Sequence, residues 1–575
     1  MGQSSSKTFT NWSGNLNTKQ RIHHPKNDDN IIYIIKKAKK HNRKLRVVGA
    51  GHSISPIVCN TKEKDIILLC LDQYQLDPEN IIIDHKNLTV TVNAGWKLAQ
   101  LAHELHKHSY YLETQPASSA FNIAGLICTP VHGAKLGASL LADSVVSLRL
   151  ITKNGEIITK YKCDPEFNYY QLSLGMFGII TSVSFKIYKL DNFYLNIKTY
   201  DFDLTNPDPA LNDFFIKTVS KCLNPFQTLN NSSDISNSSD SSHSFSTSDS
   251  FDHSDIFNLS DSQSISDLFP PPINPIPLTC NDQPKNQASP PIQEFQPITD
   301  DEYIDNRAEY VQCFLDLHNA KMVKISWKQS LKKAKIVTNY PAMFEVQKYN
   351  MLERFLRRIN TNYRKSPMTL NVIGRFAQHN IIQNIQKNYH ETRDMFWLSS
   401  AVRAYFMEYY IPISSTDSKE INIDNIYKAI EVVTTTLAKF KASDKRFILD
   451  LPCEFRFVVS SSCKLSPIYS PDTKIVYLGI EIPCIADNLF LTSKFKRQTR
   501  LNEQFRRFYT EVEQGWIALG GKPHWGKLFG FYPDQHKLFS RSEIFSPDDK
   551  AFLRSRVPKL FINNFIQKLL VNTNR

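Results

Sequence analysis

The sequence predicts an α+β fold divided into two domains, and three observations lead to this prediction. Short apolar strands alternate with amphipathic helices from about residue 20 to residue 190. A stretch rich in Ser, Asp and Pro interrupts that pattern over residues 229–300, and helices and strands are indicated again from there to the C-terminus. Hydrophobic residues make up 41% of the 575 and charged residues 22%, so a sizeable core can be buried on both sides of the interruption.

The first domain is predicted over residues 21–190, behind an N-terminal segment of residues 1–20. Its first helix begins with two aspartates and ends with four lysines, which complement the helix dipole. The predicted elements of this domain are, in order, that helix over 28–41, strands over 43–48 and 65–71, a hairpin over 81–94, a helix over 96–107, a hairpin over 145–159 and an alternating strand over 178–188.

The second domain is predicted to begin over residues 191–228 and to continue over residues 301–575, with the interruption between them. Residues 229–299 contain nine acidic residues and one lysine among many Ser and Pro residues. Because this composition cannot bury enough apolar surface to fold by itself, residues 229–300 are predicted to be a disordered insertion. The clearest elements after it are strands over 446–460 and 474–482 and a long helix over 493–519.

Composition and charge exclude several classes of protein. Ten cysteines are scattered without a C-x-x-C pair, so neither a disulfide scaffold nor a zinc site is predicted, and no metal ligand is assigned. No apolar run reaches the ~18 residues of a membrane span and the first residues are too polar for a secretory signal, which predicts a cytoplasmic protein. The net charge of +13 fits a solvated basic face, an anionic membrane or an anionic ligand. Without a helix-turn-helix, finger or RNA-recognition signature, no nucleic-acid partner is predicted.

The first seven residues, MGQSSSK, fit the pattern for N-myristoylation, with Gly2 as the acceptor and Ser6 at the required position. One acyl chain binds a membrane only marginally, so a second signal is needed. The basic residues that could supply it by attraction to anionic lipids are Lys7, Lys19, Arg21 and Lys26. The alternative is a chance match on a flexible, Ser-rich start.

Residues 46–53 read RVVGAGHS, a strand that runs into a loop of small residues. The segment superficially resembles the start of a Rossmann fold, but Ile54 stands at the third glycine position and Pro56 disfavours a helix there. Backbone amides of such a loop can approach a diphosphate closely, and His52 would lie against the ligand. Taken alone, this short motif is weak evidence, and an ordinary turn is the default interpretation.

Other motifs accompany this loop in a fixed order. Asn11-Trp12 precedes it, Ala124-Gly125 and TPVHG (129–133) come after it, and GMFGIIT (175–181) closes the first domain. Far downstream, residues 452–457 read PCEFRF and residues 520–527 read GGKPHWGK. In this order the motifs resemble those of the FAD-binding vanillyl-alcohol-oxidase superfamily. The closer resemblance is to its aldonolactone oxidase branch, the sugar-1,4-lactone and alditol oxidases.

The resemblance implies a two-domain flavoprotein, with an N-terminal FAD-binding domain of the vanillyl-alcohol-oxidase type and an α+β substrate (cap) domain whose C-terminal segment returns to the flavin. His52 matches the histidine that many members bond covalently to the flavin, and a hydrogen-bonding histidine over a non-covalent flavin is the alternative. Ile179 and Ile180 would pack near the adenine end. The residues assigned to FAD are Val48, Gly49, Ala50, Gly51, His52, Ser53, Ser118, Ser119, Asn122, Ala124, Gly125, Thr129, His132, Gly133, Gly178, Ile179 and Ile180.

The downstream motifs imply the catalytic residues. Glu454 and Arg456 alternate on a predicted strand and therefore face the same way. Such a pair is most often structural, but beside a flavin Arg456 would stabilise negative charge developing on the ring and Glu454 would hydrogen-bond the reacting hydroxyl. Lys527 would hold a neighbouring substrate oxygen, and His524 would orient it or assist proton transfer.

The implied function is FAD-dependent oxidation of a gulono-, galactono- or arabinono-1,4-lactone, with oxygen as acceptor and hydrogen peroxide as product. The same residues suit an alditol or hexose oxidase. Pro130 stands where the branch commonly has a small residue, which leaves both an oxidase and a dehydrogenase open. An alternative of another class is a catalytically degenerate flavoprotein held at a membrane or in a particle through acylated Gly2. The intact Glu454, Arg456, His524 and Lys527 argue against it.

Overall fold

The computed structural model describes residues 4–5, 9–59, 63–189, 192–224, 309–318, 320–330, 404–415, 420–445, 447, 449, 451–471, 473–485, 496–531 and 546–570. All of these belong to one compact unit. Residues 227–294 form a second unit that lies outside the described residues. The predicted disordered insertion at 229–300 and the predicted acylation site at Gly2 therefore lie outside the described residues.

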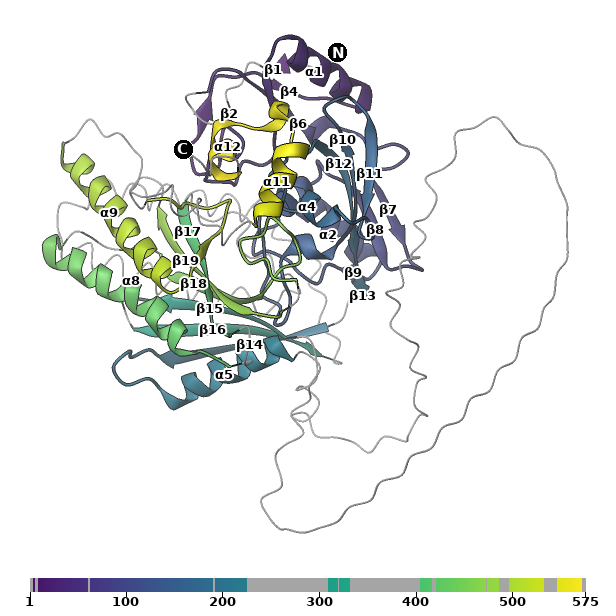
Figure 1. Ribbon diagram of the computed structural model, residues 1–575. Coiled ribbons are helices and arrows are strands. Elements are labelled where there is room, and N and C mark those ends of the chain that lie inside the picture. Colours follow the sequence, from purple (N-terminus) through teal and green to yellow (C-terminus); the bar gives the residue numbers. More distant parts are fainter. Residues whose placement is uncertain are drawn as a thin grey trace, which may run out of the picture. The chain divides into compact units, whose positions relative to one another are not determined.

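Two larger sheets and one two-stranded pair build the described part of the first domain (Figure 1). The smaller sheet has the strand order β1-β4-β6-β5, and β4, β6 and β5 run parallel. Its elements are β1 (Ser4–Ser5), β4 (Ile22–His23), α1 (Asp28–Lys40), β5 (Lys44–Val48) and β6 (Ile66–Cys70). The carboxyl ends of parallel strands meet at one edge of a sheet. The loop after β5 and the 3₁₀ turn η1 (Leu71–Gln73) after β6 therefore leave the sheet from neighbouring strands.

The larger sheet of the first domain is antiparallel, with the order β11-β10-β12-β8-β7. Its strands are β7 (Ile81–Asp84), β8 (Thr89–Asn93), β10 (Val145–Ile151), β11 (Ile157–Tyr161) and β12 (Ile179–Lys186). The remaining elements of this domain are α2 (Leu98–Lys107), β9 (Tyr110–Tyr111), α3 (Ile123–Cys128), η2 (Leu141–Ser144), α4 (Phe167–Tyr170) and β13 (Tyr188–Lys189).

The alternation of β12 does not mark an exposed face. The strand is central in its sheet, and every residue except Lys186 is buried. Its polar side is satisfied by hydroxyl contacts, since Ser184 Oγ lies 2.7 Å from both Ser147 Oγ and Thr91 Oγ1. The alternation in the sequence of β12 therefore separates a mainly apolar face from a mainly polar face, and both faces are buried.

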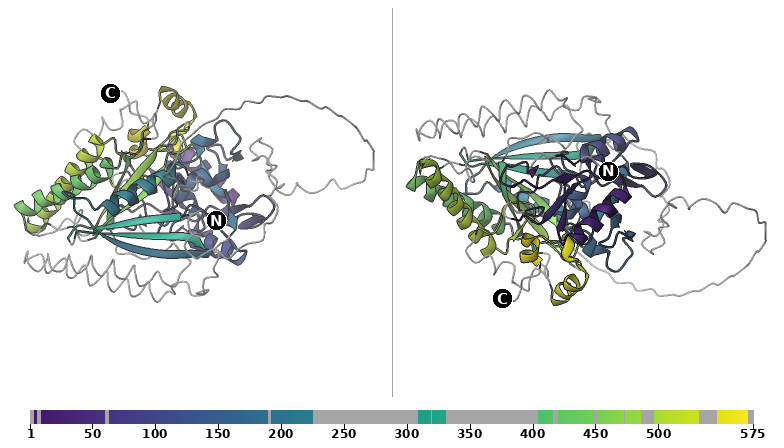
Figure 2. Two further views of the ribbon diagram at one scale, coloured as in Figure 1. Left: turned by 90° about the horizontal axis from the view of Figure 1, so that it is seen from below. Right: turned by 90° about the horizontal axis from the view of Figure 1, so that it is seen from above.

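The second domain is one antiparallel sheet of seven strands, in the order β14-β16-β15-β18-β19-β17-β20. Helices α5, α8 and α9 lie along the sheet, and α8 and α9 lie side by side (Figure 2). Their buried side chains share one hydrophobic core with the strands. The elements are β14 (Asn192–Asp201), α5 (Pro209–Leu223), β15 (Glu309–Asp316), β16 (Lys321–Ser330), β17 (Ala404–Pro412), α8 (Asp424–Ser443), β18 (Cys453–Val459), β19 (Val476–Ile485), α9 (Lys496–Ala518) and β20 (Lys522–Pro523).

The C-terminal segment packs on the first domain, although the sequence placed it with the second. It comprises α11 (Pro547–Arg556), η5 (Lys559–Phe561) and α12 (Asn564–Leu570), and Phe561 and Ile566 belong to the core of the first domain. Arg46 of β5 fastens this segment, because its guanidinium donates to the carbonyl oxygens of Phe561, Ile57, Leu174 and Gly175.

The N-terminal segment, expected to stand apart from the domains, is a structured part of the site. Strands β2 (Phe9–Thr10) and β3 (Asn17–Thr18) form a hairpin. Its turn donates from Trp12 N to Gly51 O at 2.8 Å and from Ser13 Oγ to Ala404 O at 3.0 Å, which joins both domains. The mixed α+β class is confirmed. In the described part of the chain, no helix combines the length and the apolar character needed to cross a membrane.

Candidate active site

The loop that follows β5 is held in one conformation from both sides. Gly51 has φ +74°, a left-handed conformation that glycine adopts without strain. Asn11 Nδ2 donates to Ser53 O at 3.0 Å, and Ile54 N donates to Gly526 O at 2.8 Å. The loop is thus fixed between the N-terminal hairpin and the segment that contains the GGKPHWGK motif.

The His52 ring lies among aromatic side chains. Trp12 stacks on it with ring centroids 5.3 Å apart, and Phe121 meets it edge-on at 4.6 Å. Burial, with the nearby charges of Lys527 and Lys97, lowers the pKa of His52 to about 4. The imidazole is therefore neutral at neutral pH and keeps a lone pair.

One cavity of about 430 Å³ brings the motifs of both domains together. The predicted residues that line it are Val48, Gly49, Ala50, Gly51, His52, Ser53, Ser118, Asn122, Ala124, Gly125, Thr129, His132, Gly178, Glu454, Arg456, His524 and Lys527. Ser119, Gly133, Ile179 and Ile180 are not among the lining residues. Ile179 and Ile180 lie instead in the hydrophobic core of the first domain.

The cavity wall fits the dinucleotide that the motifs imply. Gly125 is exposed and lines the cavity, and a Cβ built there meets no atom within 4 Å, so its backbone is open to a ligand. Gly49 also lines the cavity, where a Cβ would approach Asn122 Oδ1 to 2.8 Å. The rest of the wall combines the small residues of the loop at 49–53 with aliphatic and aromatic side chains such as Trp12, Leu71 and Phe121. A mostly apolar lining with a few polar groups is typical of a pocket that binds a small molecule or cofactor.

Three glutamates lie in a row across the sheet of the second domain. Glu454 on β18 is paired with Glu481 on β19, and Glu481 is paired with Glu408 on β17. Side chains directly opposite each other on antiparallel strands lie on the same face. All three line the cavity. We call Glu408, Glu454, Glu481, Arg456 and Lys527 the charged cluster.

Two cations neutralise part of this negative charge. Arg456 is buried and donates to Glu454 Oε1, while its Nε has no hydrogen-bond partner among the described residues. Lys527 Nζ lies 2.6 Å from Glu481 Oε2 and 4.0 Å from Glu408 Oε2. The predicted residues Glu454, Arg456 and Lys527 thus line one cavity together.

His132 and His524 support the far end of the row. His132 Nε2 lies 2.5 Å from Glu408 Oε1, and both side chains are buried. Burial lowers the pKa of His524 to about 3, against the opposing effect of Glu408. Gly526 N donates to His524 Nδ1 at 3.0 Å, which fixes the ring as a neutral acceptor on that side.

The cluster separates the protonation states of its carboxyl groups. Burial raises the pKa of Glu481 to about 8, and the charges of Glu408 and Glu454 add to the rise while Lys527 opposes it. Burial also tends to raise the pKa of Glu408, but His132, His524 and Lys527 hold it well below its usual range. Neighbouring carboxyl groups with opposite shifts are typical of acid–base sites.

The sequence analysis missed Glu408, Glu481 and Phe406, although all three line the cavity. The rings of Phe406 and Trp12 are stacked with their centroids 6.3 Å apart, and Lys527 Nζ lies 4.4 Å from the centroid of the Phe406 ring. A charged residue within a strand of apolar and aromatic residues was the available signal, in AYFMEYYIP and in VYLGIEIPCI. Their mutual proximity was not readable, because it depends on the pairing of strands distant in sequence.

Two family models match this chain, one on each side of the insertion. The model described as FAD binding domain matches residues 20–160, and the model described as D-arabinono-1,4-lactone oxidase matches residues 292–566. The resemblance drawn from the motifs is confirmed by these matches.

The relatives fit the same assignment. Over 185 residues the chain is 33% identical to a D-arabinono-1,4-lactone oxidase of Candida albicans, covering 30% of this chain and 33% of that protein. Over 180 residues it is 29% identical to an L-gulono-1,4-lactone dehydrogenase of Mycobacterium tuberculosis, covering 31% and 40%. The chain thus spans about a third of the length of the first of these relatives.

The fold is similar to that of a cholesterol oxidase from B. sterolicum. The TM-score is 0.66, with 99% of this chain and 97% of that chain covered at 15% sequence identity. At this identity the likeness concerns the fold alone. It confirms the two-domain flavoprotein fold that the motifs predicted.

Proposed function

We propose that this chain oxidises a carbinol group of a sugar-1,4-lactone. The family models that match it, an FAD binding domain at residues 20–160 and a D-arabinono-1,4-lactone oxidase at residues 292–566, support this proposal. One observation carries the proposal. The charged cluster of the second domain and the small-residue loop of the first line one cavity. The relatives named for arabinono- and gulono-lactones support the lactone class.

Bound FAD would supply the acceptor for the hydride that leaves the carbinol carbon. It would lie against the loop at 49–53 and the backbone of Gly125, the residues that line the first-domain side of the cavity. His52 would lie beside it, held by the Trp12 and Phe121 rings.

The cluster supplies both a hydrogen-bond acceptor for the reacting hydroxyl and cations for the negative charge that this oxidation develops. Glu454 can accept a hydrogen bond from the reacting hydroxyl and orient its carbon. Arg456, which lines the cavity, can stabilise negative charge that develops during transfer. Lys527 can donate to a neighbouring substrate oxygen, and the neutral His524 can assist in orienting it.

The cluster also favours a neutral, hydroxyl-rich substrate. Carboxylates in the cavity accept hydrogen bonds from hydroxyl groups, and an anionic acid would have to compete with them for Arg456 and Lys527. A lactone carries several hydroxyl groups without a charge, whereas the open-chain acid formed by its hydrolysis is anionic. An alditol would share the neutral character and is the nearest alternative.

The acceptor after the substrate step is proposed to be oxygen, giving hydrogen peroxide. Pro130 is buried, and its carbonyl accepts from Tyr410 Oη at 2.6 Å, which fixes this loop on one side of the cavity. The names of the relatives include both an oxidase and a dehydrogenase. Access of oxygen past the fixed loop would decide between the two.

The function is tested by mixing the purified yellow protein anaerobically with gulono-, galactono- and arabinono-1,4-lactone, with xylitol and glucose for comparison. Bleaching of the flavin by a lactone, followed by peroxide when air is admitted, is the expected result. Bleaching by xylitol alone would replace the lactone with an alditol. Bleaching by a lactone without peroxide would indicate a dehydrogenase, and no bleaching by any of them would refute the proposal.

The flavin is proposed to be bonded covalently to His52. A neutral ring nitrogen with a lone pair, as in His52, is the form that such a bond requires. After acid precipitation the yellow colour is expected to stay with the protein, and in His52→Ala it is expected to pass into the supernatant. His41→Ala, at an exposed histidine that ends α1, is the matched control. Colour released equally from the unmodified protein would show a non-covalent flavin.

Myristoylation at Gly2 is proposed as a means of membrane association. The supporting feature is the MGQSSSK sequence together with the basic residues that follow it. A myristate analogue fed to expressing cells is expected to label the chain, and Gly2→Ala is expected to abolish both the label and binding to anionic vesicles. Equal labelling of the two proteins would remove this proposal.

A further inference from the structure

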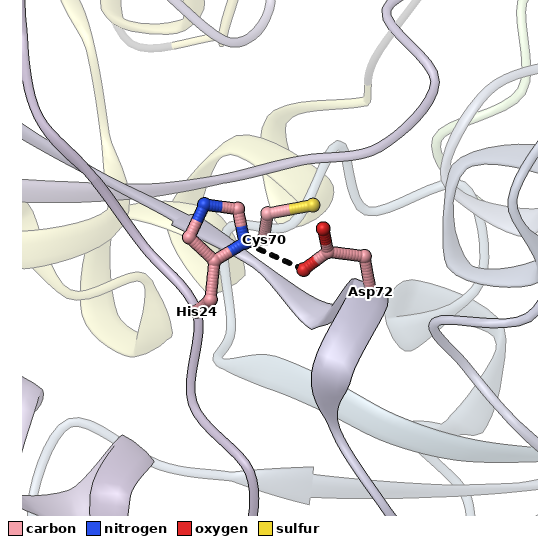
Figure 3. A group of neighbouring side chains, drawn as sticks. All are labelled: His24, Cys70 and Asp72. Carbon is pink, nitrogen blue, oxygen red and sulfur yellow. Dashed lines mark hydrogen bonds and ion pairs between the residues drawn. The ribbon is translucent and has the colours of Figure 1, made fainter. Parts of the chain in front are cut away.

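A group of three potential metal ligands lies outside the candidate active site, on the parallel sheet of the first domain (Figure 3). His24 follows β4, Cys70 ends β6 and Asp72 lies in η1. Strands β4 and β6 are parallel, with Ile22 opposite Leu68 and His23 opposite Leu69. Continuing this register by one residue places His24 beside Cys70, and the turn after β6 brings Asp72 to the same spot.

The three side chains point toward one another. His24 Nδ1 lies 2.6 Å from Asp72 Oδ1, and the ligand atoms of all three residues lie within 4.8 Å of one another. The His24 side chain is 15% exposed and the Asp72 side chain 50% exposed. The group is therefore anchored in the sheet on one side and open to solvent on the other, so a cation can enter without unfolding.

We propose that His24, Cys70 and Asp72 form a binding site for a divalent cation of the zinc type. Imidazole nitrogen, thiolate sulfur and carboxylate oxygen are the three donors that zinc uses in proteins, whereas magnesium and calcium prefer oxygen alone. One thiolate and one carboxylate balance the charge of a divalent ion. With three protein ligands, the fourth position would be left to water.

The geometry needs only a small adjustment. In a tetrahedral zinc site with bonds of ~2.0–2.3 Å, the ligand atoms lie ~3.3–3.7 Å apart. The distance between His24 Nδ1 and Asp72 Oδ1 would increase from 2.6 Å by about 1 Å or less. The Cys70 sulfur would be the third ligand atom. The side chains of His24 and Asp72 have the room to do this, because neither is fully buried.

Proton balance gives the site a distinctive signature. An ordinary thiol carries its proton at neutral pH. Binding forms a sulfur–metal bond and releases that proton, while a neutral His24 ring binds the ion through one nitrogen and keeps its proton on the other. About one proton per bound ion would appear in solution. A hydrogen bond between His24 and Asp72 alone would have no such effect.

The site is independent of the proposed function, although it lies near the cofactor cavity. Cys70 is paired with Val48, which lines the cavity. Leu71, which stands between Cys70 and Asp72 in the sequence, also lines the cavity. A bound cation would stabilise this edge of the sheet. Failure of lactone oxidation would leave the metal site untouched, and the reverse also holds.

The test uses flavin-bound, tag-free protein that has been treated with chelator, dialysed and titrated with Zn²⁺. About one ion per chain is expected, with release of about one proton, and Mg²⁺ at the same concentration is not expected to compete. Cys70→Ser and His24→Gln should each weaken binding at least ~10-fold. Cys163→Ser, at an exposed cysteine in a turn elsewhere on this domain, should bind as the unmodified protein does.

X-ray absorption at the zinc edge keeps the proposal falsifiable if a variant fails to fold. The zinc-loaded, unmodified protein is expected to show one sulfur neighbour at ~2.3 Å and nitrogen or oxygen neighbours at ~2.0–2.2 Å. A first shell without sulfur would overturn the site. So would Zn²⁺ affinity in a folded Cys70→Ser protein equal to that of the unmodified protein.

Discussion

Replacing Arg456 by Met is expected to lower turnover at least ~100-fold while FAD remains bound. Arg456 is buried on β18, its guanidinium donates to Glu454, and its Nε has no hydrogen-bond partner in the described part of the chain. A buried donor in this position gains most when negative charge develops near it, so its loss affects the oxidation step more than cofactor binding. Steady-state turnover and the flavin content of the same preparation measure both.

Glu454→Gln is expected to act in the same way, because an amide keeps the shape of the side chain and removes its charge. Arg556→Met is the matched control, since Arg556 forms an exposed ion pair with Glu166 at 3.1 Å on the surface. It should leave turnover unchanged. Full activity in Arg456→Met or in Glu454→Gln would refute the assignment of the pair to the site.

The parts of the site that the sequence revealed share one property: their residues are close together along the chain. The loop at 49–53, the alternation of Glu454 and Arg456, and the segment 524–527 are each local patterns. Their assignment to one site came from the resemblance to a family that has these motifs in the same order. The Ser-, Asp- and Pro-rich stretch at 229–300 was recognised from its composition alone.

The parts that were missed depend on pairing between distant strands. Glu408 and Glu481 are 73 positions apart in number, yet they are directly opposite each other on β17 and β19. His24 meets Cys70 in the same way, through parallel pairing of β4 and β6. Register is set by burial of whole sheet faces, so neither contact leaves a mark in local sequence.

Local sequence also does not tell which domain a terminal segment packs against, as the C-terminal helices and the N-terminal hairpin show. The sequence assigned residues 547–570 to the second domain by position, whereas Phe561 and Ile566 are buried in the first. What decides their place is the set of carbonyl groups that Arg46 requires, and those carbonyls come from three distant segments.

Replacing Lys527 by Met is expected to lower both turnover, by ~100-fold, and the free energy of unfolding, by about 3 kcal/mol. Its Nζ is the cation between Glu481 and Glu408, at 2.6 and 4.0 Å. Without it, the Glu408 carboxylate loses a compensating charge, and so does Glu481 once the pH rises above its pKa of about 8. Lys439→Met is the matched control, because Lys439 pairs with Glu511 at an exposed position and should change stability by less than ~0.5 kcal/mol.

A second substitution separates the catalytic from the structural role of Lys527. Above about pH 8, where Glu481 is ionised, the neutral amide of the double variant Lys527→Met/Glu481→Gln removes one uncompensated carboxylate, so part of the lost stability should return. Turnover should not return, because no cation is restored near the substrate. Recovery of turnover together with stability would show that Lys527 only supports the fold.

The pH dependence of stability gives an independent test of the cluster. The pKa of Glu481 is raised from 4.5 to about 8, so between these values the folded protein holds a proton that the unfolded chain has lost. Its contribution to the free energy of unfolding is therefore fully present below about pH 4.5, and it decreases by up to ~1.4 kcal/mol per pH unit as the pH rises towards 8. Glu481→Gln cannot titrate and removes this slope. Its stability relative to the unmodified protein should thus increase from pH 5 to pH 8 in urea unfolding, and parallel curves would show that Glu481 titrates normally.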